Sequence, residues 1–425
     1  MSQVAVVVPL ARPPDATVVV PGSKSLTIRA ALAAGLAEGT STISGALFAD
    51  DTEAALGALS ALGAGVRADA STGTVQVQGH GPRLAADAAD LDVRQSGTTA
   101  RLLLAVLALG PGPYRLDGAV QLRGRPMGPG LDALRQLGAD VRAEDRPGAL
   151  PVVVRGGPVR GGRVSLPGDV SSQFLSGLLL AGAAYAEGVA VDLTTELVSA
   201  PYVEMTRSVM RAFGVPVEGL SVTPAPYRPT HYRVEPDASA ASYFFAAAAI
   251  TGGRVRIDGL GRGAVQGDLA FVDVLARMGA TVRWGDDWVE VVGPERLQGI
   301  EVDLGQLSDT APTLAAVAAF AEGPTRATGI GFIRAKESDR LAAAVTELRR
   351  AGIDAEEEPD GFVVRPQGGA GAAEPRAARF ATYDDHRMAM SFALLGLRIP
   401  GVEIEDPGCV AKTFPDYFAA LDQLR

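Results

Sequence analysis

The sequence predicts an α/β (α+β) fold of two similar domains, each made of three copies of one repeated unit. The chain has 425 residues, which is too long for one ordinary hydrophobic core. Two kinds of helix alternate along it, and short β-like runs follow them. The apolar helices start near residues 23, 96, 171, 239, 308 and 384, so successive starts are 73, 75, 68, 69 and 76 residues apart. A period this long indicates a repeat architecture, and it exceeds the unit of a (β/α)8 barrel.

The first kind of helix is amphipathic and ends in a small-residue turn. Each of its first five copies has glycine just past the helix, where a left-handed cap needs it. A sixth copy, "FAALDQLR", runs to the C-terminus. The five copies are "ALSALGAGV" (58–66), "ALRQLGADV" (133–141), "VMRAFGVPV" (209–217), "VLARMGATV" (274–282) and "ELRRAGIDA" (347–355).

The second kind of helix opens on Ser, Thr or Asp and then turns almost wholly apolar. Ser and Asp are natural N-caps, and a helix that is apolar all round belongs in an interior. The six copies begin "SKSLTIRAAL", "SGTTARLLL", "SSQFLSGLLL", "SAASYFFAAAA", "SDTAPTLAAV" and "DDHRMAMSF". Three such helices in each domain would lie side by side, surrounded by sheet and outer helices.

Short strands are predicted between the helices. The N-terminal "MSQVAVVVPLARPPD" is one of them, because it lacks the basic start and the cleavage pattern of a signal peptide. The others include "TSTISG", "TVQVQG", "PYRLDG", "PVVVRG", "VAVDLT", "RVRIDG", "WVEVVG" and "GFVVRP".

Composition excludes several classes of function. The formal net charge is −10, whereas proteins that wrap nucleic acid are usually basic. The single cysteine, Cys409, rules out a disulfide framework and a CxxC zinc site, and the three histidines are far apart. We therefore expect no protein-held metal. No window holds 18 uninterrupted apolar residues, so we expect no membrane span and a cytoplasmic protein.

The repeat itself predicts where ligands bind. If the units are equivalent, the buried helices of a domain point the same way and their N-termini gather at one end. Each N-terminus carries unpaired N–H groups and about half a positive charge. Two such domains face to face would form a cleft suited to phosphate or carboxylate, even in an acidic protein.

Lysine is rare in this chain and falls at these helix starts. Of 39 Lys and Arg residues only three are lysine: Lys24, Lys336 and Lys412. A lysine is a compact, mobile charge that can also transfer a proton, whereas arginine is a rigid fork. We therefore predict that the three lysines converge on one cleft.

Polar clusters mark the same positions. They are "PGSKSLTIR", "RQSGTTAR", "LRGRPMG", "DVSSQF", "LSDTAP", "KESDR" and "DDHR". Taken singly, each has an ordinary structural interpretation. A lone KESDR is most often a solvated helix start with local ion pairs, SSQ and Asp309 are most often caps, and Gly97 is most often a turn. Their recurrence at equivalent points of an otherwise apolar repeat favours a functional role.

Ten segments in the same order identify a family. They are "PGSKSLTIRA", "QSGTTARLL", "RGRPMG", "SSQFLSGLLLA", "SAPYVEMT", "DASAASYFFAAAAI", "VQGD", "AKESDRL", "DDHRMAMSF" and "AKTFPDYF", spread from residue 21 to 418. In these segments the chain resembles the 5-enolpyruvylshikimate-3-phosphate synthases, and the likeness covers essentially all of it.

The resemblance implies a fold and an activity. The fold is two domains of three βαβαββ units, hinged around a central cleft. The domains would be residues 1–21 plus 239–425, and 22–238. The activity is transfer of the enolpyruvyl group of phosphoenolpyruvate to the 5-hydroxyl of shikimate 3-phosphate, with release of phosphate, in the shikimate pathway of aromatic amino-acid and chorismate biosynthesis. It implies no metal or organic cofactor, and we expect a monomer.

The resemblance also implies site residues. The catalytic residues would be Asp309, Glu337 and Lys24, with Asp309 as base and Glu337 as proton-transfer partner. The shikimate 3-phosphate contacts would be Lys24, Ser25, Arg29, Ser171, Ser172, Gln173, Tyr202, Asp309 and Lys336. The phosphoenolpyruvate contacts would be Lys24, Gly97, Arg125, Gln173, Arg340, Arg387 and Lys412. Two positions depart from the family pattern: Ala200 stands where relatives often have lysine, and Phe332 where some have asparagine.

Two alternatives stay open on the residues alone. One is the related transferase that acts on UDP-N-acetylglucosamine, most members of which carry a reactive cysteine near "LRGRPMG"; this chain has none there. The other is a non-catalytic anion-binding or RNA-end-binding protein of the same repeat, which the net charge of −10 disfavours.

Overall fold

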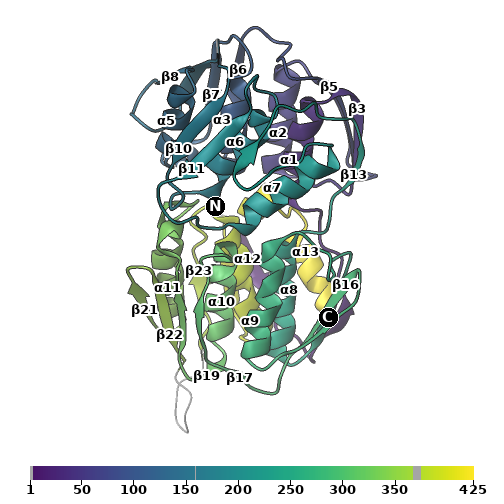
Figure 1. Ribbon diagram of the computed structural model, residues 1–425. Helices are drawn as coiled ribbons and strands as arrows, with labels where there is room; N and C mark the ends of the chain where they lie inside the picture. Colours follow the sequence, from purple (N-terminus) through teal and green to yellow (C-terminus); the bar gives the residue numbers. More distant parts are fainter. Residues whose placement is uncertain (1–2, 158, 367–374) are drawn as a thin grey trace. The chain divides into compact units, whose positions relative to one another are not determined.

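The computed structural model describes residues 3–157, 159–366 and 375–425. The chain forms two compact units (Figure 1). One is Gly22–Glu235, called here the insert unit; the other, the terminal unit, joins Met1–Pro21 to Pro236–Arg425. These boundaries differ by three residues from the predicted crossing at 238–239, because helix α8 (Ala238–Thr251) and the segment that precedes it pack within the terminal unit.

The insert unit contains three sheets and seven helices in its described residues. Its sheets have the strand orders β13-β3-β5-β4, β6-β7-β9-β8 and β10-β11-β12. The strands are β3 (Glu38–Ser44), β4 (Gly65–Asp69), β5 (Thr74–His80), β6 (Ala89–Asp92), β7 (Tyr114–Asp117), β8 (Asp140–Ala143), β9 (Val152–Arg155), β10 (Gly162–Leu166), β11 (Val189–Leu193), β12 (Ser221–Val222) and β13 (His231–Arg233). The helices are α1 (Lys24–Gly35), α2 (Asp50–Ala61), α3 (Gly97–Leu107), α4 (Val120–Arg123), α5 (Gly128–Gln136), α6 (Ser172–Gly182) and α7 (Pro201–Ala212).

The terminal unit repeats the plan. Its main sheets have the orders β2-β14-β16-β15, β18-β20-β22-β21 and β1-β24-β23. The strands are β1 (Val4–Val7), β2 (Asp15–Thr17), β14 (Arg254–Asp258), β15 (Thr281–Trp284), β16 (Trp288–Val292), β17 (Leu297–Gln298), β18 (Glu301–Asp303), β19 (Ala321–Glu322), β20 (Thr325–Thr328), β21 (Asp354–Glu358), β22 (Gly361–Arg365), β23 (Arg379–Phe380) and β24 (Val402–Glu405). The helices are α8, α9 (Phe271–Arg277), α10 (Ala311–Ala318), α11 (Arg340–Arg350), α12 (His386–Ala393), α13 (Tyr417–Leu421) and the 3-10 turns η1 (Gly267–Ala270), η2 (Ser308–Thr310), η3 (Gly331–Ala335), η4 (Leu394–Leu397), η5 (Pro407–Lys412) and η6 (Asp422–Leu424).

The sheets confirm the predicted βαβαββ unit. In β6-β7-β9-β8 the first two strands are parallel, with Leu91 opposite Leu116, and a buried helix crosses between them. The last two strands form an antiparallel hairpin, with Val141 opposite Val154. The same order recurs in the sheets that contain β3, β14 and β20.

Strands far apart in sequence complete two of these sheets. Strand β2, near the N-terminus, is the parallel partner of β14, and β13, at the end of the insert unit, is the parallel partner of β3. Strand β2 precedes the point where the chain enters the insert unit and β14 follows its return, whereas β13 and β3 both lie within the insert unit. The pairing of β2 with β14 therefore joins the two sequence segments of the terminal unit.

The predicted buried helices are buried. All the residues of α3 are shielded from solvent, and so are all those of α8 except Ser239, in its first turn, and Thr251, its last residue. In five of the six, a Ser or Asp side chain caps the first turn: Ser23, Ser96, Ser171, Asp237 and Asp385 each accept a backbone N–H bond. The first three are the predicted opening residues, whereas Asp237 lies two residues before the predicted Ser239 and Asp385 lies one residue after the predicted Asp384. The exception is α10, which the turn η2 precedes and whose N-cap, Thr310, makes no side-chain cap bond.

Within each unit the buried helices run parallel, as predicted. Near the starts of α3 and α6, Gln173 Nε2 donates to Thr98 Oγ1 at 3.0 Å; near their ends, Tyr185 Oη donates to Ala105 O at 2.8 Å. In the terminal unit the hydroxyl of Thr313 on α10 lies 3.4 Å from Ser242 on α8 and 3.3 Å from Ser391 on α12. Helices α8, α10 and α12 lie side by side (Figure 1). The helix starts therefore gather at one end of each unit.

The predicted glycine caps of the outer helices are confirmed. Gly63, Gly138, Gly214, Gly279 and Gly352 have φ of +100°, +93°, +85°, +109° and +79°. A side chain at these positions would be strained, so glycine ends each helix at small cost.

No helix in the described part of the chain is both long and apolar enough to cross a lipid bilayer. Across the same residues, His, Cys, Asp and Glu side chains do not gather into a group of three that could hold a metal ion.

Candidate active site

Lys24 begins α1 and forms an ion pair with the start of the next helix. Its ammonium lies 3.1 Å from Asp51 Oδ2, and the two side chains are 11% and 2% exposed. The carbonyl of Asp51 accepts a bond from Thr99 Oγ1 at 3.3 Å, and Thr99 also bonds the α3 cap Ser96. Asp51 therefore links the starts of α1, α2 and α3.

Gly97 makes room for a guanidinium. A Cβ atom at Gly97 would lie 2.5 Å from Arg125 Nη1 and 2.7 Å from its Cζ, which is closer than real Cβ atoms approach other atoms. Arg125 is itself buried. The absence of a side chain at Gly97 therefore lets the Arg125 guanidinium pack on the first turn of α3. This packing is a reason for glycine at position 97 in addition to the turn that the sequence suggests.

The segment Ser171–Gln173 opens α6 and is held by an arginine of α3. Arg101 Nη1 donates to Gln173 Oε1 at 3.0 Å and to Ser171 Oγ at 3.4 Å, and Nη2 donates to Pro126 O at 3.0 Å. Ser171 also accepts from the backbone N–H of Gln173, which is the cap that the ordinary interpretation of SSQ expects. Ser172, the first residue of the helix, is buried beside them.

Arg29 braces two helices of the insert unit. Its side chain is fully buried; Nε donates to Thr206 Oγ1 at 2.7 Å, Nη1 to Ser25 O at 3.0 Å and Nη2 to Tyr202 O at 3.3 Å. Burial lowers the pKa of Arg29 to about 10, so the group stays charged near neutral pH. This bracing gives Arg29 a structural role in fixing the start of α7, where Tyr202 lies.

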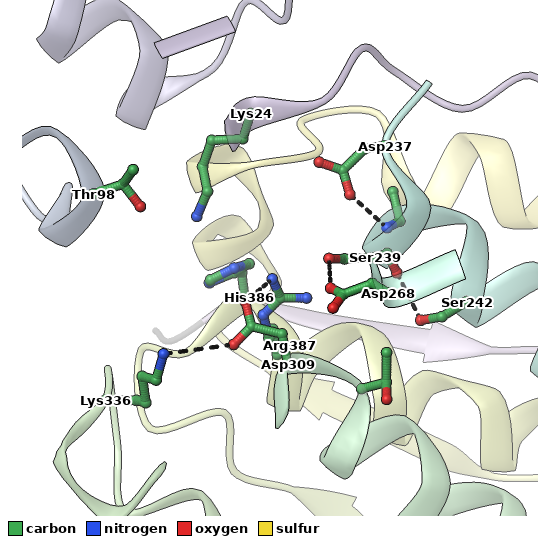
Figure 2. Close-up of polar contacts among 12 residues, drawn as sticks. Lys24, Thr98, Asp237, Ser239, Ser242, Asp268, Asp309, Lys336, His386 and Arg387 are labelled. Carbon is green, nitrogen blue, oxygen red and sulfur yellow. Dashed lines mark hydrogen bonds and ion pairs between the residues drawn. The ribbon is translucent and has the colours of Figure 1, made fainter. Parts of the chain in front are cut away.

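In the terminal unit, Asp309 lies among cations. Its Oδ1 accepts from Arg340 Nη1 at 3.1 Å, its Oδ2 accepts from Arg387 Nη2 at 2.6 Å, and the ammonium of Lys336 is 3.8 Å from Oδ1. Figure 2 shows Lys336 pointing at this carboxylate, beside Arg387. Asp309 is 16% exposed and lies inside the turn η2, whose N-cap is Leu307, so it is not the N-cap that its place in the sequence suggests.

Arg340 is the most buried member of this group. It is 1% exposed, and besides Asp309 it contacts Asp385 through two bonds and Glu337 through one of 2.8 Å. Burial opposes the charge, but the carboxylates of Asp385, Glu337 and Asp309 outweigh it and raise the pKa of the guanidinium further. KESDR is therefore not the solvated helix start that its sequence alone suggests.

A family model of EPSP synthase (3-phosphoshikimate 1-carboxyvinyltransferase) matches residues 11–421 of this chain.

The chain belongs to the EPSP synthase family.

Individual relatives agree. The chain is 45% identical over 421 residues to the 3-phosphoshikimate 1-carboxyvinyltransferase of Nostoc punctiforme, covering 98% of this chain and 97% of that protein. It is 44% identical over 418 residues to that of Serratia proteamaculans, covering 96% of each. Among solved structures, EPSP synthase from Acinetobacter baumannii superposes with a TM-score of 0.82 at 30% identity over 100% of this chain and 98% of that one. The enolpyruvyl transferase NikO from Streptomyces tendae shares the fold, with a TM-score of 0.77 at 21% identity over 100% and 98% of the two chains.

The site residues predicted from the EPSP synthase resemblance divide between the two units. The insert unit contains Lys24, Ser25, Arg29, Gly97, Arg125, Ser171, Ser172, Gln173 and Tyr202. Among them, Arg29 contacts Ser25 and Tyr202, Gly97 lies beside Arg125, and Ser171 bonds Gln173. The terminal unit brings together Asp309, Lys336, Glu337, Arg340 and Arg387, and it also holds Lys412, which is buried at the end of η5. Lys24 lies in one unit and Lys336 and Lys412 in the other, so their convergence stays a prediction.

Three residues of these clusters received no role from the EPSP synthase resemblance, although two of them lie in polar clusters that the sequence singled out. They are Arg101, Asp51 and Asp385. Arg101 stands inside "SGTTARLLL" and Asp385 inside "DDHR", so both lay in segments that carry the EPSP synthase resemblance. Asp51 lies in a different segment, and its sequence gives no signal that it would meet Lys24.

The two departures from the EPSP synthase pattern lie at Phe332 and Ala200. The ring of Phe332 lies 5.9 Å from the Lys336 ammonium, within the range of a cation–π contact, so an aromatic face replaces a polar group beside this lysine. Ala200 is the N-cap position of α7 and makes no side-chain cap bond.

Proposed function

We propose that this protein is an enzyme that transfers the enolpyruvyl group of phosphoenolpyruvate to the 5-hydroxyl of shikimate 3-phosphate and releases phosphate. Membership of the EPSP synthase family over residues 11–421 carries the proposal. The arrangement of charge supports it, since each unit gathers helix starts together with arginine or lysine side chains. Such positions suit the phosphates and carboxylates of these two substrates.

The reaction needs an acid and a base in turn. In the addition step the 5-oxygen of shikimate 3-phosphate loses its proton and bonds to carbon 2 of phosphoenolpyruvate, while carbon 3 gains a proton. In the elimination step carbon 3 loses a proton and the bond between carbon 2 and the phosphate oxygen breaks. The products are the enolpyruvyl ether and inorganic phosphate. General acid–base groups therefore act twice, with their roles exchanged.

We assign the base to Asp309 and the proton-transfer partner to Glu337. Asp309 is 16% exposed and Glu337 11%, so both are sheltered but accessible, and each is bonded by the buried guanidinium of Arg340. Lys24 is assigned a share of the proton transfer because an ammonium can release a proton and a guanidinium cannot.

The arginines are assigned to the anionic groups of phosphoenolpyruvate. In the structure Arg340 and Arg387 both donate to Asp309, so a substrate carboxylate would compete with Asp309 for the same donors. Once substrate carboxylate occupies the two guanidinium groups, Asp309 is released from them and becomes a better proton acceptor. Substrate binding would thereby prepare the base for the reaction.

A phosphate-release assay tests the function. The unmodified protein with phosphoenolpyruvate and shikimate 3-phosphate should release phosphate and form the enolpyruvyl ether in equal amounts, measured by colorimetry and 31P NMR. UDP-N-acetylglucosamine in place of shikimate 3-phosphate should give neither product. If phosphate were released from phosphoenolpyruvate with UDP-N-acetylglucosamine but not with shikimate 3-phosphate, the protein would be assigned to the related transferase. The monomeric state and the cytoplasmic location stay predictions.

A further inference from the structure

Arg101 is a buried arginine that contacts substrate-binding candidates without being one of them. It lies on α3, one turn after Gly97, and is 3% exposed. Its guanidinium donates to Ser171 and Gln173 on α6 and to Pro126 O, next to Arg125. The ring of Phe174 lies 5.1 Å from its Cζ. One residue of α3 therefore fixes the start of α6.

The contact decides how Gln173 presents its amide. A guanidinium can only donate hydrogen bonds, so the atom of Gln173 that faces Arg101 at 3.0 Å must be the carbonyl oxygen. The NH2 group then points the other way, and one of its two hydrogens is donated to Thr98 Oγ1 at 3.0 Å. The second hydrogen makes Gln173 a donor toward a ligand.

The same accounting applies to Ser171. Its hydroxyl oxygen accepts from Arg101 Nη1 at 3.4 Å and from the backbone N–H of Gln173 at 3.3 Å. A hydroxyl has two acceptor sites and one donor hydrogen. With both acceptor sites used, its remaining capacity is to donate.

We propose that Arg101 is a positioning residue. The side chains of Ser171 and Gln173 can each donate or accept hydrogen bonds, and Arg101 orients both of them as donors toward an anion. A phosphate or carboxylate near neutral pH mainly accepts hydrogen bonds, so the site favours such a group and disfavours a ligand that must donate. The identity of the anion, shikimate 3-phosphate, rests on the proposed function. The orientation of the two side chains does not.

The variant Arg101→Lys tests the role because it keeps the charge and loses the fork. One ammonium cannot occupy the three acceptor directions that the planar guanidinium serves. We expect the Kd for shikimate 3-phosphate, measured by calorimetry without phosphoenolpyruvate, to rise about 10- to 100-fold, as for loss of hydrogen bonds to a charged group. The control is Arg142→Lys, whose side chain is 73% exposed and pairs with Asp140. It should leave this Kd within about twofold.

The variant Gln173→Glu tests the mechanism. Glutamate keeps an acceptor for Arg101 but has no donor to offer, so it should weaken shikimate 3-phosphate binding as much as Arg101→Lys or more. Because Arg101 acts through Gln173, the double variant should lose far less than the product of the two single losses. Multiplicative losses would overturn the proposal. So would a lowered melting temperature of Arg101→Lys with an unchanged Kd, which would make Arg101 a purely structural brace.

A measurement on the free protein separates this inference from the proposed function. In protein labelled with 15N at glutamine, the side-chain NH2 signals of Gln173 are assigned by their loss in Gln173→Glu. We expect these signals to shift and broaden in Arg101→Lys, because the amide is no longer held in one orientation. Unchanged signals would overturn the inference even in an active enzyme. Conversely, an inactive protein with shifted signals would count against the proposed function and leave the orientation supported.

Discussion

Arg340 donates two hydrogen bonds to Asp385: Nε donates to Oδ2 at 2.8 Å and Nη2 donates to Oδ1 at 3.2 Å. Both side chains are almost fully buried. The carboxylate also caps α12 by accepting the backbone N–H of Arg387 at 2.9 Å. A two-point contact of this kind fixes the plane of the guanidinium. The orientation of Arg340 toward Asp309 and Glu337 therefore depends on Asp385.

Replacing Asp385 by Asn should damage both stability and activity. The amide can still cap α12, but it removes the negative charge and places a donor against the guanidinium. Breaking a buried ion pair from one side costs about 3–5 kcal/mol of unfolding free energy, which urea titration would measure. The exposed pair of Arg142 and Asp140 provides the control: Asp140→Asn should cost less than about 1 kcal/mol. Equal costs for the two variants would remove the special role of Asp385.

Replacing Asp309 by Ala should abolish most turnover while the protein stays folded. A positioned general base contributes roughly 10²–10⁴-fold to the rate, so kcat should fall by that factor. The affinity for shikimate 3-phosphate, measured by calorimetry, should fall only modestly. Near-normal kcat in the folded variant would mean that Asp309 merely neutralises Arg340 and Arg387.

Replacing Lys24 by Arg should impair turnover far more than stability. The charge beside Asp51 is kept, so the melting temperature should change by a few degrees at most. The wider fork releases protons poorly, and we expect kcat to fall at least about 10²-fold if Lys24 shares the proton transfer. Wild-type turnover in this variant would mean that the site does not need lysine at position 24. The scarcity of lysine would then be a feature of composition without a functional cause.

Replacing Gly97 by Ala should weaken phosphoenolpyruvate binding selectively. The new Cβ would lie 2.5 Å from Arg125 Nη1, so the guanidinium must move. We expect the KM for phosphoenolpyruvate to rise about 10-fold or more, as for the loss of one charged hydrogen bond, with a smaller change for shikimate 3-phosphate. The matched control is Gly57→Ala in α2, where a Cβ meets no atom within 4 Å. That variant should keep both KM values and gain slightly in stability.

The free energy of unfolding should decrease at alkaline pH, and the first group to cause the decrease should be the single cysteine, Cys409. Burial raises the pKa of Cys409 to about 12 from 9.0, so between these values the unfolded chain loses a proton that the folded protein keeps. The unfolded state then binds fewer protons, and the unfolding free energy falls as pH rises from 9 toward 12, by at most about 1.4 kcal/mol per pH unit for this group. Burial likewise raises the pKa of Tyr243 to about 12 from 10.0, which adds to the decline above pH 10.

The variant Cys409→Ala isolates the first part of that decline. Between pH 9 and 10 its unfolding free energy should fall less steeply than that of the unmodified protein. The unfolding free energies of both proteins would be measured by urea titration at pH 8, 9 and 10. If they fell equally with pH in the two proteins, the assignment to Cys409 would be contradicted.

The sequence by itself determined the repeat, its helices and their ends. Glycine past the outer helices and Ser or Asp before the buried ones act through bonds within a few residues, so local chemistry predicts them, as Gly63 and Ser171 show. The Ser, Thr or Asp openings of the six apolar helices, repeated at similar spacing, indicated parallel buried helices with their starts gathered. The resemblance in ten segments then predicted the family, which the comparison over residues 11–421 confirmed.

Only the tertiary structure decided which partners those helix starts meet. Asp51, at the start of α2, pairs with Lys24, at the start of α1. Arg101 bonds Gln173, which is 72 residues away in the sequence, and Asp385 bonds Arg340, which is 45 residues away. It also showed that Asp309 is a partner of arginines rather than a cap. No local pattern encodes such pairs, because a side chain's long-range neighbour is set by how helices pack together, and packing is settled by shape and burial over the whole unit. For the same reason, a residue that orients others, such as Arg101, becomes visible only once its contacts are known.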